Sequence, residues 1–398
     1  MNERNKRQMK GMNDKVFNSI KEGCNYLLKN TTKNGTKFIY LRDSNGKIIK
    51  GKYNMLRHCG CLWALSKAYK TVLFESCNDE IIRTLNDLFE YPKQNTDIDN
   101  GRNNEDNKND ENDKNNRIAL LKDKEWYKLG GNALYALSLH EYTKLTSKFI
   151  KHSKSNGKSI KTDDASKTQL CRDIHGGMKR FMNKNGSVQH YKIDANTNAA
   201  SDFVSEYYPG EAVLSFCILK DYKAAFKITK QLKKTRDAAV SEEEQIHDHW
   251  LLQGIELLYF HYENKSEGNK EKEGNKEKEG NKENNININI NKNAQMLIEY
   301  GNKIGQAIIN YEERYEDRSC RIACRIEGLI PLYRITKNKK YLDAINKLVI
   351  ELLKSQCKDA SHKACGAFKD DGGYQIDYTQ HSISALCEYY KLMTKHFL

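Results

Sequence analysis

The sequence has no long apolar run. None of its 398 residues belongs to a stretch that approaches the roughly 18 consecutive apolar residues of a transmembrane helix. Residues 1–6 include no apolar signal region. These two features argue against a membrane-spanning or secreted chain, so we expect a soluble cytoplasmic protein without a membrane partner.

Motifs for common cofactors are also missing. The sequence contains neither a glycine-rich phosphate loop nor a dinucleotide fingerprint, which argues against a nucleotide cofactor. The 11 cysteines lack the Cys-x-x-Cys spacing of a structural zinc site, and Cys320 and Cys324 are one helical turn apart. Cysteines within apolar helical runs are instead expected to be reduced, small buried side chains; these are Cys59, Cys61, Cys217, Cys324 and Cys387. We therefore expect no metal and no cofactor.

The formal net charge is +14, which raises the question of nucleic-acid binding. However, lysine and asparagine are abundant along the whole chain. No basic stripe carries interleaved aromatic residues. We therefore expect a small molecule or an oligosaccharide as the partner, and no nucleic acid. The oligomeric state is left open.

Six times along the chain, a polar or charged turn leads directly into an almost wholly apolar helical run. Such apolar helices are typical of buried positions, so the polar turns would gather at one end of the fold. The six junctions are Arg57-His58-Cys59-Gly60, Gly130-Gly131-Asn132, Tyr207-Tyr208-Pro209-Gly210-Glu211, His247-Asp248-His249-Trp250, Arg325-Ile326-Glu327-Gly328 and Asp377-Tyr378-Thr379-Gln380-His381.

Amphipathic segments alternate with these apolar runs, at about residues 14–28, 80–89, 171–182, 223–232, 294–309 and 341–353. The alternation predicts an all-α fold of six αα-hairpins, with the apolar helices in an inner ring. Residues 1–398 would form one domain. Low-complexity stretches at about 93–117, 151–167 and 263–293 are predicted to be disordered insertions. Small β-hairpins are expected at 37–52 and 187–193, at the mouth of the ring.

Six hairpins around an apolar inner ring resemble the (α/α)6 toroid of the six-hairpin glycosidases and the N-acylglucosamine 2-epimerase superfamily. The resemblance is one of architecture and covers most of the chain outside the insertions. It implies a carbohydrate-active enzyme with its site in the funnel at one end of the inner ring. The superfamily uses arginine, glutamate and histidine residues on inner helices, and Arg57, His58, Glu327 and His381 are compatible with that use.

The junctions supply candidates for acid–base chemistry and for sugar binding. Paired carboxylates suit glycoside hydrolysis, and histidines transfer protons near neutral pH. The catalytic candidates are His58, Glu211, His249, Glu327, Asp377 and His381. Arginines can hold anionic groups, and aromatic rings can stack on sugars. The substrate-binding candidates are Tyr53, Arg57, Tyr208, Trp250, Arg325 and Tyr378.

Structural roles remain open for several candidates. Glu211 could favour its helix dipole, and Asp248 or Asp377 could cap a helix. Asp377 could alternatively orient His381, four residues later on the same helix face. His247 and His249 should point in different directions, so we expect at most one of them to be functional.

Four functions fit these residues. The first is a six-hairpin glycosidase that performs acid–base chemistry on a sugar or sugar derivative. The second is a sugar epimerase or isomerase of the 2-epimerase type, in which paired histidines move a proton beside a carbonyl. The third is a non-catalytic toroid that binds a glycan or peptide. The fourth is a zinc prenyltransferase-like toroid, although the Asp-x-Cys ligand pair of that group is missing.

Overall fold

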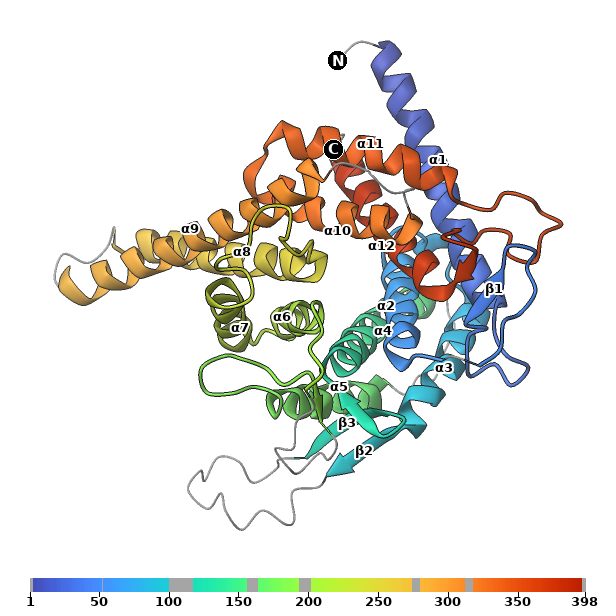
Figure 1. The fold of residues 1–398 in the computed structure, drawn as a ribbon, viewed down its shortest axis with the longest axis horizontal. Coiled ribbons are helices and arrows are strands. Elements are labelled where there is room, and N and C mark those ends of the chain that lie inside the picture. Colours follow the sequence, from blue (N-terminus) through green and yellow to red (C-terminus); the bar gives the residue numbers. More distant parts are fainter. Residues whose placement is uncertain are drawn as a thin grey trace.

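The computed structural model describes residues 3–51, 53–99, 117–155, 164–192, 202–273, 280–311 and 318–395. Within these ranges the chain forms two concentric layers of helices around a central axis (Figure 1). The predicted all-α toroid is therefore confirmed. No helix in these ranges has both the length and the apolar character needed to cross a membrane.

The inner layer consists of the helices that follow the six polar junctions. Each contacts the next in the chain, and the last contacts the first, so the ring is closed. Their buried residues run almost without interruption, as in Pro209–Cys217, because each helix is covered by neighbours on all sides. The inner helices are α2 (Met55–Lys70), α4 (Leu129–Ser155), α6 (Tyr208–Ile218), α8 (His249–Glu273), α10 (Ser319–Thr336) and α12 (Ile376–Lys395).

The outer layer consists of the amphipathic helices, each with one buried face and one polar face. In α7, for example, Ala225, Ile228 and Leu232 are buried while lysines occupy the other side. Side-chain caps begin several of these helices, such as Asn78 on α3 and Asp221 on α7. The outer helices are α1 (Glu3–Lys29), α3 (Asp79–Gln94), α5 (Asp164–Lys179), α7 (Tyr222–Lys234), α9 (Gly280–Asn310) and α11 (Lys339–Lys354).

Two small antiparallel sheets and a short 3-10 helix, Phe74–Ser76, complete the described fold. Strand β1 (Leu41–Asp43) pairs with β6 (Gly373–Gln375), which joins the loop around β1 to the start of α12. The loop also folds back on itself as the expected hairpin. The Arg42–Ile48 bridge closes it, with hydrogen bonds from Asp43 N to Lys47 O and from Ile49 N to Leu41 O, both 2.9 Å. The second sheet, in the order β2-β3-β4-β5, contains Thr96–Asp99, Ile118–Asp123, Trp126–Lys128 and Tyr191–Lys192.

The three low-complexity stretches include regular structure at their edges. Residues 93–99 finish α3 and form β2, and residues 151–155 and 164–167 belong to α4 and α5. Residues 264–273 and 280–293 are helical in α8 and α9, where we expected a disordered insertion. The glutamate and lysine in this stretch have high helix propensity. Residues 100–116, 156–163 and 274–279 lie outside the described residues.

Candidate functional site

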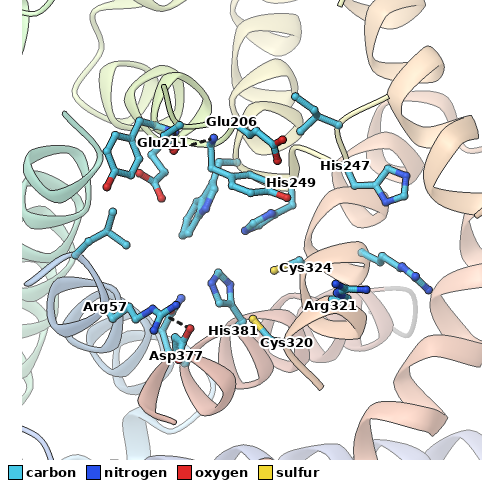
Figure 2. A pocket seen from close by; sticks show the side chains of 18 of the residues that line it. Arg57, Glu206, Glu211, His247, His249, Cys320, Arg321, Cys324, Asp377 and His381 are labelled. Atoms are coloured by element: carbon cyan, nitrogen blue, oxygen red, sulfur yellow. Dashed lines mark hydrogen bonds and ion pairs between the residues drawn. The ribbon is translucent and has the colours of Figure 1, made fainter. Parts of the chain in front are cut away.

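A cavity of about 620 Å³ opens where the inner helices begin. All six inner helices contribute side chains to it, mostly from their first turns (Figure 2). The common polarity of the junctions therefore does gather polar groups at one end of the ring. The predicted site residues that line this cavity are Arg57, Tyr208, Glu211, His249, Trp250, Arg325, Asp377 and His381.

A buried carboxylate, that of Glu327, lies close to two histidines that line the cavity. His381 Nδ1 lies 2.9 Å from Glu327 Oε2, and His249 Nε2 lies 3.7 Å from the same oxygen. The two imidazole rings are 5.1 Å apart at 76°, and Trp250 packs against both. Glu327 is only 1% exposed and does not line the cavity. It therefore orients the His381 imidazole by a hydrogen bond and lies close to that of His249, and both imidazoles line the cavity (Figure 2).

The two histidines differ in their affinity for a proton. Burial lowers the pKa of His249 to about 3, although Glu327 partly opposes the shift. Burial would also lower the pKa of His381, but Cys320, Glu327 and Asp377 outweigh it and raise the value to about 9. At neutral pH the pair then consists of one neutral imidazole, which can accept a proton, and one imidazolium, which can donate one.

Arg57 and Asp377 form an ion pair across the junction of α2 and α12. The Arg57 Nε and Asp377 Oδ2 atoms are 3.0 Å apart, and Arg57 Nη1 also donates to the Tyr40 hydroxyl. Gln375 Nε2 donates to the other carboxylate oxygen at 2.6 Å. Asp377 is thus neither a helix cap nor the orienting partner of His381; Glu327 has the second role. The ion pair fixes a guanidinium at the cavity wall.

Glu211 lies at the cavity wall but is almost completely buried. Its Oε2 has no hydrogen-bond partner among the described residues. Burial, with a smaller contribution from Asp248, raises the pKa of this carboxyl to about 8. Gly130 makes room for it, because a Cβ there would collide with Oε2. Glu211 is therefore a protonated carboxylic acid at neutral pH.

Asp248 has a structural role. Its Oδ1 accepts a hydrogen bond from the Leu251 amide at 2.9 Å, which caps α8. Its Oδ2 accepts one from Arg236 Nη1 at 2.8 Å. The cap holds the first turn of α8 in place, and that turn carries His249.

His58 and Tyr53 are not part of the cavity. The Tyr53 hydroxyl donates to His58 Nδ1 at 2.6 Å, and His58 Nε2 donates to the Leu88 carbonyl at 2.9 Å. Burial lowers the pKa of His58 to about 4. The geometry gives this pair a packing role between α2 and α3. Tyr378, predicted to bind substrate, is also absent from the cavity lining.

The far side of the cavity holds Arg325 and His247, which both pack on Tyr311. The guanidinium of Arg325 is 4.6 Å from the Tyr311 ring centroid, and the His247 ring is 5.2 Å from it, nearly perpendicular. His247 and His249 therefore both line the cavity, and His247 packs on Tyr311, away from the pair formed by His249 and His381. That at most one of His247 and His249 is functional stays a prediction.

Two cysteines at the cavity were not among the predicted site residues. Cys320 and Cys324 on α10 line the wall beside His381 (Figure 2). The sequence predicts Cys324 to be a small buried apolar residue, whereas it is only partly buried and lines the cavity. Their spacing of one helical turn on a polar junction is the signal that indicates a shared, cavity-facing side of α10.

The sequence matches no family model and no curated protein. Solved structures share its fold. The cellobiose 2-epimerase of Spirochaeta thermophila DSM 6192 is 11% identical, with a TM-score of 0.61 over 99% of this chain and 98% of that one. A D-mannose isomerase is 11% identical, with a TM-score of 0.59 over 95% of this chain and 97% of that one. The α-1,6-mannanase GH76A of Salegentibacter sp. HEL1_6 is 12% identical, with a TM-score of 0.55 over 96% of this chain and 99% of that one.

This chain therefore shares its fold, an (α/α)6 toroid, with a sugar epimerase, a sugar isomerase and a mannanase. The resemblance in fold expected from the alternating helices is thereby confirmed.

Proposed function

We propose that this chain is a carbohydrate-active enzyme that epimerises or isomerises a sugar by acid–base chemistry. The observation that carries this proposal is the pair of neighbouring, cavity-lining imidazoles, His249 and His381, with the buried Glu327 hydrogen-bonded to His381 and 3.7 Å from His249. Because the rings are 5.1 Å apart, one substrate carbon can lie within reach of both.

The reaction would proceed on the open-chain form of the sugar. His249 accepts the proton from carbon 2, the C–H electron pair forms the C1–C2 double bond, and the carbonyl oxygen takes the negative charge. In epimerisation, His381 returns a proton to the opposite face of carbon 2 and the carbonyl reforms. In isomerisation, carbon 1 receives the proton, while the hydroxyl proton moves from O2 to O1. No electrons are gained or lost, so the step needs no redox partner.

Arg57 has the chemistry to stabilise the enediolate oxygen. Its guanidinium is fixed by Asp377 and Tyr40 and remains partly exposed at the cavity wall. A positive charge held in place before the reaction lowers the energy of a developing anion without reorganisation. Trp250 and Tyr208 supply aromatic faces for the sugar.

The size of the cavity and the structural neighbours support a sugar substrate. About 620 Å³ lies within the range of roughly 300–1,000 Å³ typical of small-molecule sites. Two of the proteins with the same fold are a cellobiose 2-epimerase and a D-mannose isomerase. A mono- or oligosaccharide partner follows. The cytoplasmic location stays a prediction. So does the absence of a nucleic-acid partner, a membrane partner and a required cofactor.

Hydrolysis is the second candidate, and Glu211 is the observation that favours it. A carboxyl group that stays protonated at neutral pH can act as the general acid of a glycosidase, and Asp377 could provide the second carboxylate. However, Glu327 is buried beneath the imidazoles. An inactive variant of the mannanase neighbour carries alanine at two consecutive aspartates, and no two consecutive aspartates occur among the described residues lining this cavity.

The test is a substrate screen by NMR in D₂O with a chelator present. It should include D-mannose, D-glucose, N-acylglucosamine, cellobiose and α-1,6-linked mannose oligosaccharides. We expect solvent deuterium at carbon 2 or carbon 1 of a substrate, and a rate about 10²–10⁴ lower in His381→Asn. His362→Asn is the matched control, because this half-buried histidine lies outside the cavity.

Each other outcome identifies a different function. Anomeric release without deuterium incorporation, abolished by Glu211→Gln, would replace epimerisation by hydrolysis. Turnover with the chelator present argues against a zinc prenyltransferase-like reaction. Binding of a sugar or peptide without any turnover, unchanged in Glu211→Gln and His381→Asn, would show a non-catalytic binding protein.

A further inference from the structure

Four side chains with metal-binding atoms converge at the cavity wall. They are His249 on α8, Cys324 and Glu327 on α10, and His381 on α12. One ligand atom from each residue lies within 4.8 Å of all the others. Three inner helices thus bring two imidazoles, a thiol and a carboxylate to one point, although the sequence shows no metal-binding motif.

We propose that these four residues form a binding site for a borderline-soft divalent cation such as Zn²⁺. A tetrahedral zinc site uses nitrogen, thiolate and carboxylate ligands at about 2.0–2.3 Å, which places neighbouring ligand atoms roughly 3.3–3.8 Å apart. His249 Nε2 and Glu327 Oε2 are already 3.7 Å apart. Contraction of the longest separation by about 1 Å, within reach of side-chain rotation, would complete the geometry.

His249 provides a second, independent indication of an unfilled ligand position. The side chain is only 4% exposed, yet neither ring nitrogen has a hydrogen-bond partner among the described residues. Buried polar atoms in folded proteins nearly always have a partner. A cation bound to one ring nitrogen would remove part of the free-energy cost of burying that nitrogen without a partner.

Ligand chemistry determines which cation fits. A thiol with two imidazoles favours zinc, cobalt or nickel over magnesium and calcium, which prefer sites made of oxygen atoms only. His249 and His381 are also the imidazoles of the proposed sugar reaction. A cation must displace the proton that His381 holds at neutral pH and the proton of the Cys324 thiol. A ring nitrogen bound to the cation cannot transfer a proton to or from the substrate. Zn²⁺ should therefore inhibit sugar turnover.

Co²⁺ is the probe for this site, because a thiolate ligand gives it a charge-transfer absorption band and tetrahedral geometry gives intense visible bands. We expect the full chain, purified with chelator and then freed of it, to show both signals at one equivalent of Co²⁺. Addition of Zn²⁺ should abolish them. In Cys324→Ser the charge-transfer band should disappear, and affinity should fall at least tenfold, roughly the smallest effect of disturbing a metal site.

Cys320→Ser and Cys77→Ser are the matched controls. Cys320 lies one turn earlier on the same cavity wall but outside the four-residue cluster, and Cys77 follows the short 3-10 helix Phe74–Ser76. Both variants should keep the band. Circular dichroism and thermal melting establish that each variant is folded. A second variant, His249→Gln, should weaken Co²⁺ binding and leave the charge-transfer band detectable at high Co²⁺.

The proposal is overturned if Co²⁺ gives no thiolate band, or if the band survives in Cys324→Ser. It is also overturned if His249→Gln binds Co²⁺ as tightly as the unmodified chain. These spectra do not depend on turnover. A chain that binds Co²⁺ but converts no sugar would contradict the proposed function alone.

Discussion

At the scale of single residues, the direction of a side chain from its helix decides what it can do. Arg57 and His58 are adjacent on α2, and successive residues of a helix point about 100° apart. Arg57 reaches the cavity, whereas His58 points to α3 and hydrogen-bonds with Tyr53 and Leu88. Sequence reasoning selected the pair but could not tell which member faces inward. Glu327 was selected as a catalytic group, and only the structure shows that it lies beneath the histidines.

Glu211 should make the stability of the protein depend on pH. Its folded pKa of about 8 exceeds the unfolded value, so the folded state holds the proton more tightly. The resulting stabilisation is complete below the unfolded pKa and is lost as pH rises to about 8. Glu211→Gln cannot ionise and should avoid this loss, which is on the order of a few kcal/mol.

Urea denaturation at pH 6 and pH 9 measures this effect. The free energy of unfolding of Glu211→Gln, relative to that of the unmodified chain, should be higher at pH 9 than at pH 6. An equal difference at both pH values would show that Glu211 is ionised throughout, and would remove its role as a protonated acid.

At the scale of elements, the periodicity of apolar residues predicts the helices well. Each helix is either buried on all sides or buried on one face, and each case has its own pattern. The six apolar runs became inner helices and the six amphipathic segments became outer ones. The strands were harder to predict. The run Ile118-Ala119-Leu120-Leu121 is continuously apolar, and a short apolar run fits a strand or a helix equally well. The pairing of β1 with β6 joins segments over 300 residues apart, which no local pattern reveals.

The start of α8 depends on close packing against α6. A Cβ on Gly210 would collide with the Asp248 carboxylate, which caps α8 and binds Arg236. Gly210→Ala should therefore displace the first turn of α8 together with His249. We expect a loss of roughly 1–3 kcal/mol, the cost of leaving a buried partner unsatisfied, and a disproportionate loss of sugar turnover.

Gly131→Ala is the matched control, since Gly131 also lies at the start of an inner helix but its added Cβ would meet only Lys128 Cβ at 3.8 Å. Thermal melting and initial rates should be measured for both variants. Equal melting temperatures and equal initial rates in the two variants would contradict the role assigned to the contact between Gly210 and Asp248.

At the scale of the whole molecule, six repeats predict a closed ring because each inner helix needs neighbours on both sides. Contact between α12 and α2 closes it (Figure 1). The ring explains why segments distant in sequence share one cavity: every junction faces the same end. What the sequence could not supply is the distance between groups from different repeats, such as the 2.9 Å between His381 and Glu327.

The ring should tolerate a short connection in place of residues 100–117. Asp99 and Ile118 are paired at the end of the antiparallel strands β2 and β3, so an Asn-Gly turn can join them directly. We expect the melting temperature to change by only a few degrees and sugar turnover to be kept. The same replacement over 93–117, which also removes the end of α3 and all of β2, is the contrasting variant and should destabilise the protein. Equal melting temperatures for the two variants would contradict this division.

The most direct test of the account is hydrogen exchange at carbon 2 of each epimer of the substrate, measured in D₂O for single-histidine variants. If His249 and His381 act on opposite faces, His381→Asn should exchange the proton of one epimer and His249→Asn that of the other, and neither should interconvert the two. Exchange of the same epimer by both variants, or epimerisation in the double variant, would contradict the central claim that these two imidazoles are the acid and the base.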